Sequence, residues 1–100
     1  MYKLIAIDLD GTLLNSYGIV SEKNKQALIE ANKKGAEIVI ASGRSTNSVK
    51  NIANDLGICN YIICGNGSLI YDLQHEEIIY DKFIDKKKAL QIIEICEQNS

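Results

Sequence analysis

The sequence lacks the features that mark membrane, repeat and secreted proteins. It has no proline, no low-complexity segment and no convincing internal repeat. No apolar run approaches the roughly 20 residues that a membrane-spanning helix needs. The apolar residues near the start, 2–9, are too few for a signal peptide, and acids follow them at once. These absences predict a cytoplasmic protein with no membrane partner.

The cysteines and the charges exclude two further classes. Cys59, Cys64 and Cys96 are odd in number and form no C-x-x-C pair, so we expect buried thiols and neither a disulfide framework nor a zinc site. A net charge of −2 and an isoelectric point near 5.3 leave no basic patch for nucleic acid. The lysine run at 86–88 is interpreted as the solvated first turn of a helix.

What remains is the composition of one small globular domain. Of the 100 residues, 46% are hydrophobic and 24% charged, so disorder is not expected. Short apolar segments alternate with segments of helical periodicity, which indicates a parallel sheet with right-handed crossovers, then a hairpin and a last helix. The expected strands are 2–9, 36–41, 61–64, 68–71 and 77–80, and the expected helices begin after Ser21, at about Thr46 and after Asp85.

A polar cluster follows each of the first three expected strands. The clusters are Asp8-Leu9-Asp10-Gly11-Thr12, Ser42-Gly43-Arg44 and Gly65-Asn66-Gly67. The carboxyl ends of parallel strands share one edge of the sheet, and open α/β sheets bind their ligands there. We therefore expect the three clusters to form one site, although each alone could be a turn.

The first cluster has residues suited to phosphoryl transfer. Asp8 and Asp10 stand two residues apart at a strand end and would repel each other unless a cation or nearby donors offset their charge. Mg²⁺ binds one or two carboxylates together with substrate phosphate. One carboxylate can be a nucleophile toward phosphorus, and the other a general acid and base. Gly11 permits a sharp turn that presents backbone N–H groups, and Thr12 adds a hydroxyl donor.

The string from Asp8 to Leu14 resembles the first motif of the haloacid dehalogenase superfamily. Ala41-Ser42-Gly43-Arg44 is similar to the second motif in its Cof-type sugar-phosphatase branch. Gly65-Asn66-Gly67-Ser68 resembles the Asn-Gly turn of that branch, where alanine usually stands in place of Ser68. The resemblance implies an α/β fold with a Rossmann-like three-layer α/β/α core. It also implies a Mg²⁺-dependent phosphoric-monoester hydrolase that acts on sugar phosphates or similar small phosphorylated metabolites.

The same resemblance implies roles for individual residues. Asp8 would be the nucleophile that becomes an aspartyl-phosphate, and a metal ligand. Asp10 would be the general acid and base, with its backbone carbonyl on the metal. Ser42 would hydrogen-bond the phosphoryl group, and Arg44 would organise the mouth of the site or reach substrate. The implied phosphate-binding set is Leu9, Gly11, Thr12, Ser42, Gly43, Arg44, Asn66 and Gly67.

Two family features have no counterpart in these residues, namely a motif with a lysine and an acidic pair that completes the metal site. Family members carry both after a large cap domain, whose entrance the hairpin and last helix resemble. We expect residues 1–70 to be the first part of the core and 71–100 the start of the cap, in a protein about two and a half times as long. The strand at 2–9 would then be an exposed edge, through which we expect self-association.

Other interpretations stay open at this point. A phosphotransferase or phosphomutase would use the same residues, and an inactive fragment or metal-binding module would keep the fold alone. A receiver-type phosphoacceptor domain would place its acidic pair and its acceptor aspartate on different strands, which this sequence does not do. Ser42 and Arg44 could form a plain helix-entry loop, Asn66-Gly67 a simple hairpin turn, and His75 an exposed histidine with no partner near it in sequence.

Overall fold

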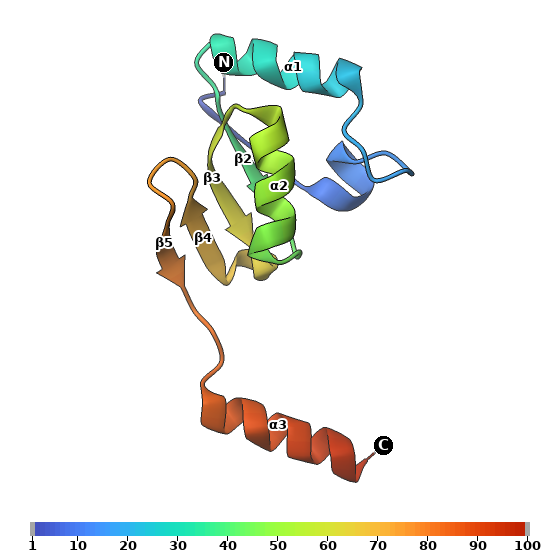
Figure 1. Cartoon of the computed structure of the whole chain (residues 1–100), viewed down its shortest axis with the longest axis vertical. Coiled ribbons are helices and arrows are strands. Elements are labelled where there is room, and N and C mark those ends of the chain that lie inside the picture. The colour runs from blue at the N-terminus through green and yellow to red at the C-terminus, as the bar shows by residue number, and fades with distance from the viewer. Residues whose placement is uncertain (1, 100) are drawn as a thin grey trace.

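The computed structural model describes residues 2–99 as a five-stranded sheet with two helices packed against it and a third helix standing apart (Figure 1). The α/β fold class expected from the sequence is confirmed. The strands are β1 (Leu4–Ile7), β2 (Glu37–Ala41), β3 (Cys59–Cys64), β4 (Leu69–Asp72) and β5 (Glu77–Asp81). The helices are α1 (Glu22–Lys33), α2 (Thr46–Leu56) and α3 (Lys86–Gln98).

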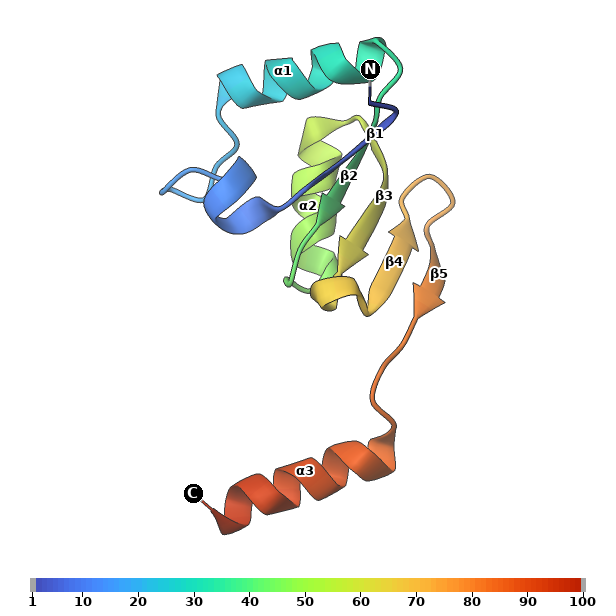
Figure 2. The same cartoon turned by 180° about the vertical axis from the view of Figure 1, so that it is seen from behind.

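The sheet is mixed, and its strands lie in sequence order from β1 to β5. β1, β2 and β3 are parallel, whereas β4 pairs antiparallel with β3, and β5 antiparallel with β4. The expected hairpin is therefore confirmed. Seen from behind, the arrowheads of β2, β3 and β5 point to the same end of the sheet, and α3 lies beyond that end (Figure 2).

Local sequence signals set the ends of the helices. The Ser21 hydroxyl accepts a hydrogen bond from the backbone N–H of Asn24 and so caps the start of α1. Asp85 caps α3 in the same way by accepting from the N–H of Lys88. Gly57 ends α2 in the left-handed conformation, with φ of 72°, which costs glycine little because it has no Cβ.

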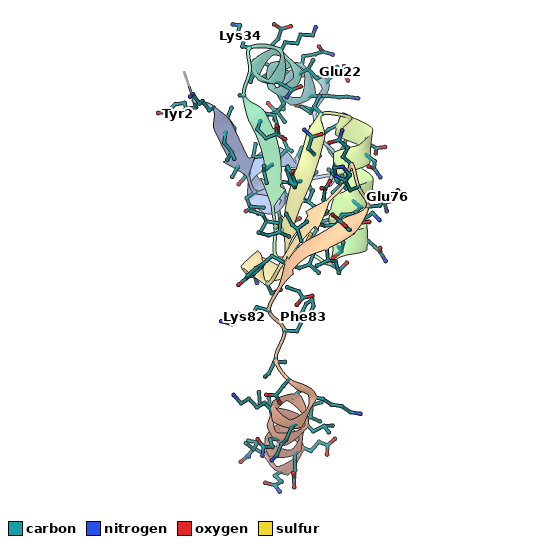
Figure 3. The ribbon with its side chains drawn as sticks, turned by 90° about the vertical axis from the view of Figure 1, so that its left-hand side faces the viewer. Tyr2, Glu22, Lys34, Glu76, Lys82 and Phe83 are labelled. Atoms are coloured by element: carbon teal, nitrogen blue, oxygen red, sulfur yellow. The ribbon has the colours of Figure 1, made fainter. Side chains whose placement is uncertain are left out.

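The core lies between one face of the sheet and helices α1 and α2. Ile38, Ile40 and Ile62 of the sheet are fully buried there, together with Val49 of α2, and Leu28 of α1 packs into the same cluster. Within residues 2–99, the opposite face of the sheet carries no helix, as the side view shows (Figure 3). The described chain thus supplies two of the three layers that the resemblance implies.

The uncovered face is apolar, and the first strand, expected over residues 2–9, is an edge strand of the described sheet. β1 is shorter, and Leu4 keeps 58% of its surface exposed. This exposure has two causes. β1 pairs only with β2 in the described chain, and Leu4 points to the uncovered face. A shallow hollow of about 270 Å³ runs over this face, lined by Leu4, Ala6, Val39, Tyr61, Ile63, Ile70 and Ile79.

The last helix, α3, lies away from the sheet, and all its residues except half-buried Ala89 are exposed. The expectation of buried thiols therefore fails for Cys96, which lies on α3, whereas Cys64 is buried and Cys59 half-buried. Burial raises the pKa of Cys59 to about 11.

The expected division of the chain at residue 70, between core and cap, stays a prediction; β4 spans this position and is hydrogen-bonded to β3. No helix in the part of the chain that the structure describes is long and apolar enough to cross a bilayer.

Candidate active site

The three polar clusters meet at the carboxyl edge of the parallel strands. A hollow of about 470 Å³ lies there, lined by Asp8, Ala41, Ser42, Gly43, Ile63, Asn66 and Gly67. Backbone hydrogen bonds join two of the loops, from the N–H of Gly65 to the carbonyl of Arg44 (3.1 Å) and from the N–H of Asn66 to the carbonyl of Ser42 (3.1 Å). The loops that line the hollow therefore support one another.

The loop after β1 is a wide turn over Leu9–Leu13, which the buried side chain of Leu9 anchors in the core. The backbone N–H of Leu13 bonds to the carbonyl of Asp8 (3.2 Å) and closes the turn. Gly11 has φ of 76°, and no atom lies within 4 Å of the position its Cβ would take. Glycine is therefore favoured there by the backbone conformation alone. The turn leaves the Asp8 carboxylate exposed at the hollow.

The side chain of Asp10 points to a different partner. The guanidinium of Arg44 holds both of its carboxylate oxygens, with Nε 2.8 Å from Oδ2 and Nη2 2.6 Å from Oδ1. The third contact of the guanidinium is from Nη1 to the hydroxyl of Ser48 on α2 (3.1 Å). Hydrogen bonding to Arg44 holds the pKa of Asp10 below its ordinary value, and Asp10 raises the pKa of Arg44 in return.

Ser42 is the buried hydroxyl of the site, with 5% of its surface exposed. Its oxygen accepts a hydrogen bond from the backbone N–H of Arg44 (3.0 Å). The hydroxyl proton therefore remains available to donate into the hollow that Ser42 lines.

The backbone conformation of Asn66 and the close approach of its side chain to Gly43 define its position in the site. It adopts the left-handed conformation with φ of 57°, which asparagine tolerates better than most residues. A Cβ added to Gly43 would lie only 2.7 Å from Oδ1 of Asn66. A side chain at position 43 would therefore displace the Asn66 side chain, which comes from another loop and occupies that space.

Thr12 lies apart from the hollow. It lines a separate surface depression next to α1, with Asn24, Ala27 and Leu28 among its neighbours. Neither Asp10 nor Arg44 is among the residues that line the hollow either. The structure thus brings five of the ten predicted site residues to the lining of the hollow, namely Asp8, Ser42, Gly43, Asn66 and Gly67, and it pairs Asp10 with Arg44 outside that lining.

The donor set can be tested against Mg²⁺. Within residues 2–99 no group of three or more His, Cys, Asp or Glu side chains comes together as a metal cage. Mg²⁺ does not require one, because it binds through one or two carboxylates and completes its shell with water and phosphate oxygens. The exposed carboxylate of Asp8 makes no ion pair in the described chain and fits that requirement. The side chain of Asp10 is engaged by Arg44.

Three contacts were not foreseen from the sequence. Nothing in the spacing connects Asp10 with Arg44, 34 residues away, or marks Ser48 as a support for the arginine. The expectation that His75 has no nearby partner was wrong. Its Nδ1 lies 2.8 Å from Oδ2 of buried Asp72. The other carboxylate oxygen of Asp72, Oδ1, accepts hydrogen bonds from the backbone N–H groups of Gln74 and His75. An aspartate that begins a polar turn three residues before a histidine is the signal that could have predicted this pair.

Comparison with known proteins finds phosphatases among the relatives of this chain. The chain is 43% identical over 98 residues to the phosphatase YwpJ of Bacillus subtilis. This alignment covers 98% of this chain and 34% of that protein. It is 44% identical over 70 residues to the 5-amino-6-(5-phospho-D-ribitylamino)uracil phosphatase YcsE of the same organism, covering 70% of this chain and 28% of that protein. The chain therefore spans about a third of the length of these relatives.

A solved structure has the same fold over nearly the whole of this chain. A sugar phosphatase of subclass IIB of the haloacid dehalogenase superfamily superposes with a TM-score of 0.80 at 28% identity, over 97% of this chain and 38% of that one. The family model of haloacid dehalogenase-like hydrolases matches residues 5–100. Since this match covers nearly the whole chain, the chain belongs to the haloacid dehalogenase-like hydrolases.

Proposed function

We propose that this chain carries the nucleophile and phosphate-binding loops of a Mg²⁺-dependent phosphoric-monoester hydrolase. The observation that carries the proposal is the hollow in which Asp8 lies beside Ser42 and Asn66. An exposed carboxylate next to a buried hydroxyl is suited to attack a phosphoryl group that the hydroxyl holds in place. The phosphatase names of the relatives support the same reaction class.

In the first step an oxygen of Asp8 attacks phosphorus and forms a new P–O bond. The bond between phosphorus and the leaving oxygen breaks, and Asp10, which enters this step in its protonated form, gives the leaving oxygen its proton. Asp8 then carries an acyl phosphate. Ser42 donates a hydrogen bond to a phosphoryl oxygen, and because its hydroxyl is buried, this donor competes little with water.

In the second step Asp10 takes a proton from water, and the water oxygen attacks the phosphorus. The P–O bond to Asp8 breaks, which restores the carboxylate and releases inorganic phosphate. When bound, Mg²⁺ would supply positive charge that offsets the carboxylates and the phosphate, with Asp8 as its side-chain ligand and Asp10 contributing its backbone carbonyl.

The substrates we propose are sugar phosphates or similar small phosphorylated metabolites. One relative is named for a phosphorylated ribityl compound and one solved structure is a sugar phosphatase. A phosphotransferase or phosphomutase would share the first step and differ in the acceptor of the second, where a substrate hydroxyl would replace water. The absence of partners among nucleic acids and membranes, and a cytoplasmic location, stay predictions from the sequence.

We further propose that the chain self-associates through its first strand. The outer edge of β1 is unpaired in the described chain, and exposed Leu4 lies beside it on an apolar face. An unpaired strand edge is a template for pairing with another chain.

The test of the proposed activity is hydrolysis of p-nitrophenyl phosphate with and without Mg²⁺. Wild type, Asp8→Asn and the control Asp55→Asn are compared, because Asp55 is an exposed carboxylate at the far end of α2. We expect release of p-nitrophenol that needs Mg²⁺, that Asp55→Asn retains and that Asp8→Asn loses. Mass spectrometry of acid-quenched reactions should find one added phosphoryl group on the peptide that contains Asp8. Hydrolysis that persists in Asp8→Asn would contradict the assignment of the nucleophile.

A further inference from the structure

The ion pair between Asp10 and Arg44 occupies groups that the proposed reaction needs. Both carboxylate oxygens of Asp10 accept hydrogen bonds from the guanidinium. While that pair is intact, each of the two oxygens has one lone pair engaged and the carboxylate is held in one orientation, toward Arg44. The pair also lies beside the hollow and not on its lining. This arrangement directs the Asp10 carboxylate toward Arg44, which is not among the residues that line the hollow.

Arg44 is well placed to be held. Its backbone N–H is fixed by the Ser42 hydroxyl and its carbonyl by the N–H of Gly65. Its Nη1 rests on Ser48 at the start of α2. A planar guanidinium that is supported from behind in this way can hold a carboxylate with two parallel hydrogen bonds.

Arg44 is equally well suited to bind phosphate. It is the only arginine in the sequence, and it follows directly after Ser42 and Gly43, which line the hollow. A guanidinium fork matches phosphate as well as carboxylate. A phosphate group that enters with nearly two negative charges competes with the single charge of Asp10 for the same donors.

We propose that Arg44 is a positioning residue that latches Asp10 before substrate binds, and that a phosphate group bound in the hollow draws Arg44 away and frees Asp10. The proposal rests on the proposed function, because the ligand that opens the latch is the phosphate of the substrate. It assigns to Arg44 a control over when Asp10 becomes available. A ligand without a phosphate group leaves the latch closed.

The single arginine makes the latch directly observable. Protein labelled with ¹⁵N-arginine gives one side-chain Nε–H signal in NMR, which reports Arg44 alone. In wild type we expect this proton to exchange slowly with water. Asp10→Asn should speed the exchange about fivefold, as expected for loss of a well-aligned but partly exposed ion pair. Asp55→Asn is the matched control and should leave the signal unchanged, and circular dichroism verifies that each variant is folded. Equal exchange in wild type and folded Asp10→Asn would overturn the latch.

The second half of the experiment adds Mg²⁺ and inorganic phosphate, with Mg²⁺ chloride alone as reference. Backbone amide signals of Ser42 and Asn66 report phosphate in the hollow, and the Nε–H signal reports the latch. We expect both to shift together, and Asp10→Asn to bind phosphate about fivefold more tightly because the competing carboxylate is gone. Shifted amides with an unchanged Nε–H signal would overturn the latch and leave the proposed function intact. If the amides do not shift either, phosphate does not bind in the hollow, and the proposed function itself fails.

Discussion

Replacing Gly43 by alanine should damage the site much more than the fold. A Cβ at position 43 would lie 2.7 Å from Oδ1 and 3.3 Å from Cγ of Asn66, so the Asn66 side chain must move. Asn66 is exposed, and only its side chain is in the way. Turning it out of a favourable rotamer costs about 0.5–1.5 kcal/mol. Gly43 has no left-handed backbone conformation, so alanine returns about 0.4–1 kcal/mol by restricting the unfolded chain.

These two contributions nearly cancel. We expect the free energy of unfolding of Gly43→Ala to stay within about 1 kcal/mol of wild type, which is a shift of at most about 4–8 °C in Tm for a domain of this size. The effect on the hollow is larger, because the Asn66 amide no longer lines it. Loss of one hydrogen bond to a charged phosphate, worth about 1.5–3 kcal/mol, weakens phosphate binding by about ten- to a hundredfold.

Thermal unfolding by circular dichroism and phosphate titration by NMR measure the two effects separately. Asn66→Ala should reproduce the weakened binding, and the double variant with Gly43→Ala should lose little more, since both changes remove the same contact. Gly65→Ala is the contrasting control, because φ of 56° disfavours alanine and its Cβ would collide with the Ser68 hydroxyl; it should lower Tm clearly. Wild-type phosphate affinity in Gly43→Ala, or additive losses in the double variant, would refute the reasoning.

Three further predictions concern other parts of the molecule. The pKa of His75 is raised, chiefly by its hydrogen bond with Asp72, and the pKa of Asp72 is lowered, chiefly by the backbone N–H of His75. His75 contributes its full stabilisation at pH values below its ordinary pKa of 6.5, and this contribution is lost as the pH rises through the raised pKa. Asp72 contributes its full stabilisation at pH values above its ordinary pKa of 3.8, and this contribution is lost as the pH falls through the lowered pKa. Tm measured against pH should therefore fall above neutrality in wild type but not in His75→Gln, and identical profiles would disprove the pairing. Leu4→Lys should shift light scattering toward the monomer by placing charge beside the open strand edge, and an unchanged mass would argue against association there. Iodoacetamide should alkylate exposed Cys96 well before Cys59, whose thiol has a pKa of about 11, and equal rates followed by mass spectrometry would contradict that order.

The sequence by itself determined the elements and the meeting of the clusters. The Ser21 cap, the Gly57 end and the apolar run at Ile38–Ile40 are local signals, since each acts through neighbours a few residues away. Convergence of the clusters followed from one topological rule, that parallel strands end at a common edge. The family motifs supplied the roles expected of Asp8 and Ser42, which the fold alone does not assign.

The tertiary structure decided which side chains contact one another across those loops. The pairing of Asp10 with Arg44 joins the loop after β1 to the loop before α2, and the fit of Asn66 against Gly43 depends on a close approach of the Asn66 side chain to the Gly43 backbone. Neither distance is encoded in a local pattern. The exposure of β1 likewise depends on what covers the edge and the second face of the sheet. The apolar sequence of residues 4–7 does not reveal this, because a buried strand and an uncovered strand can have the same composition.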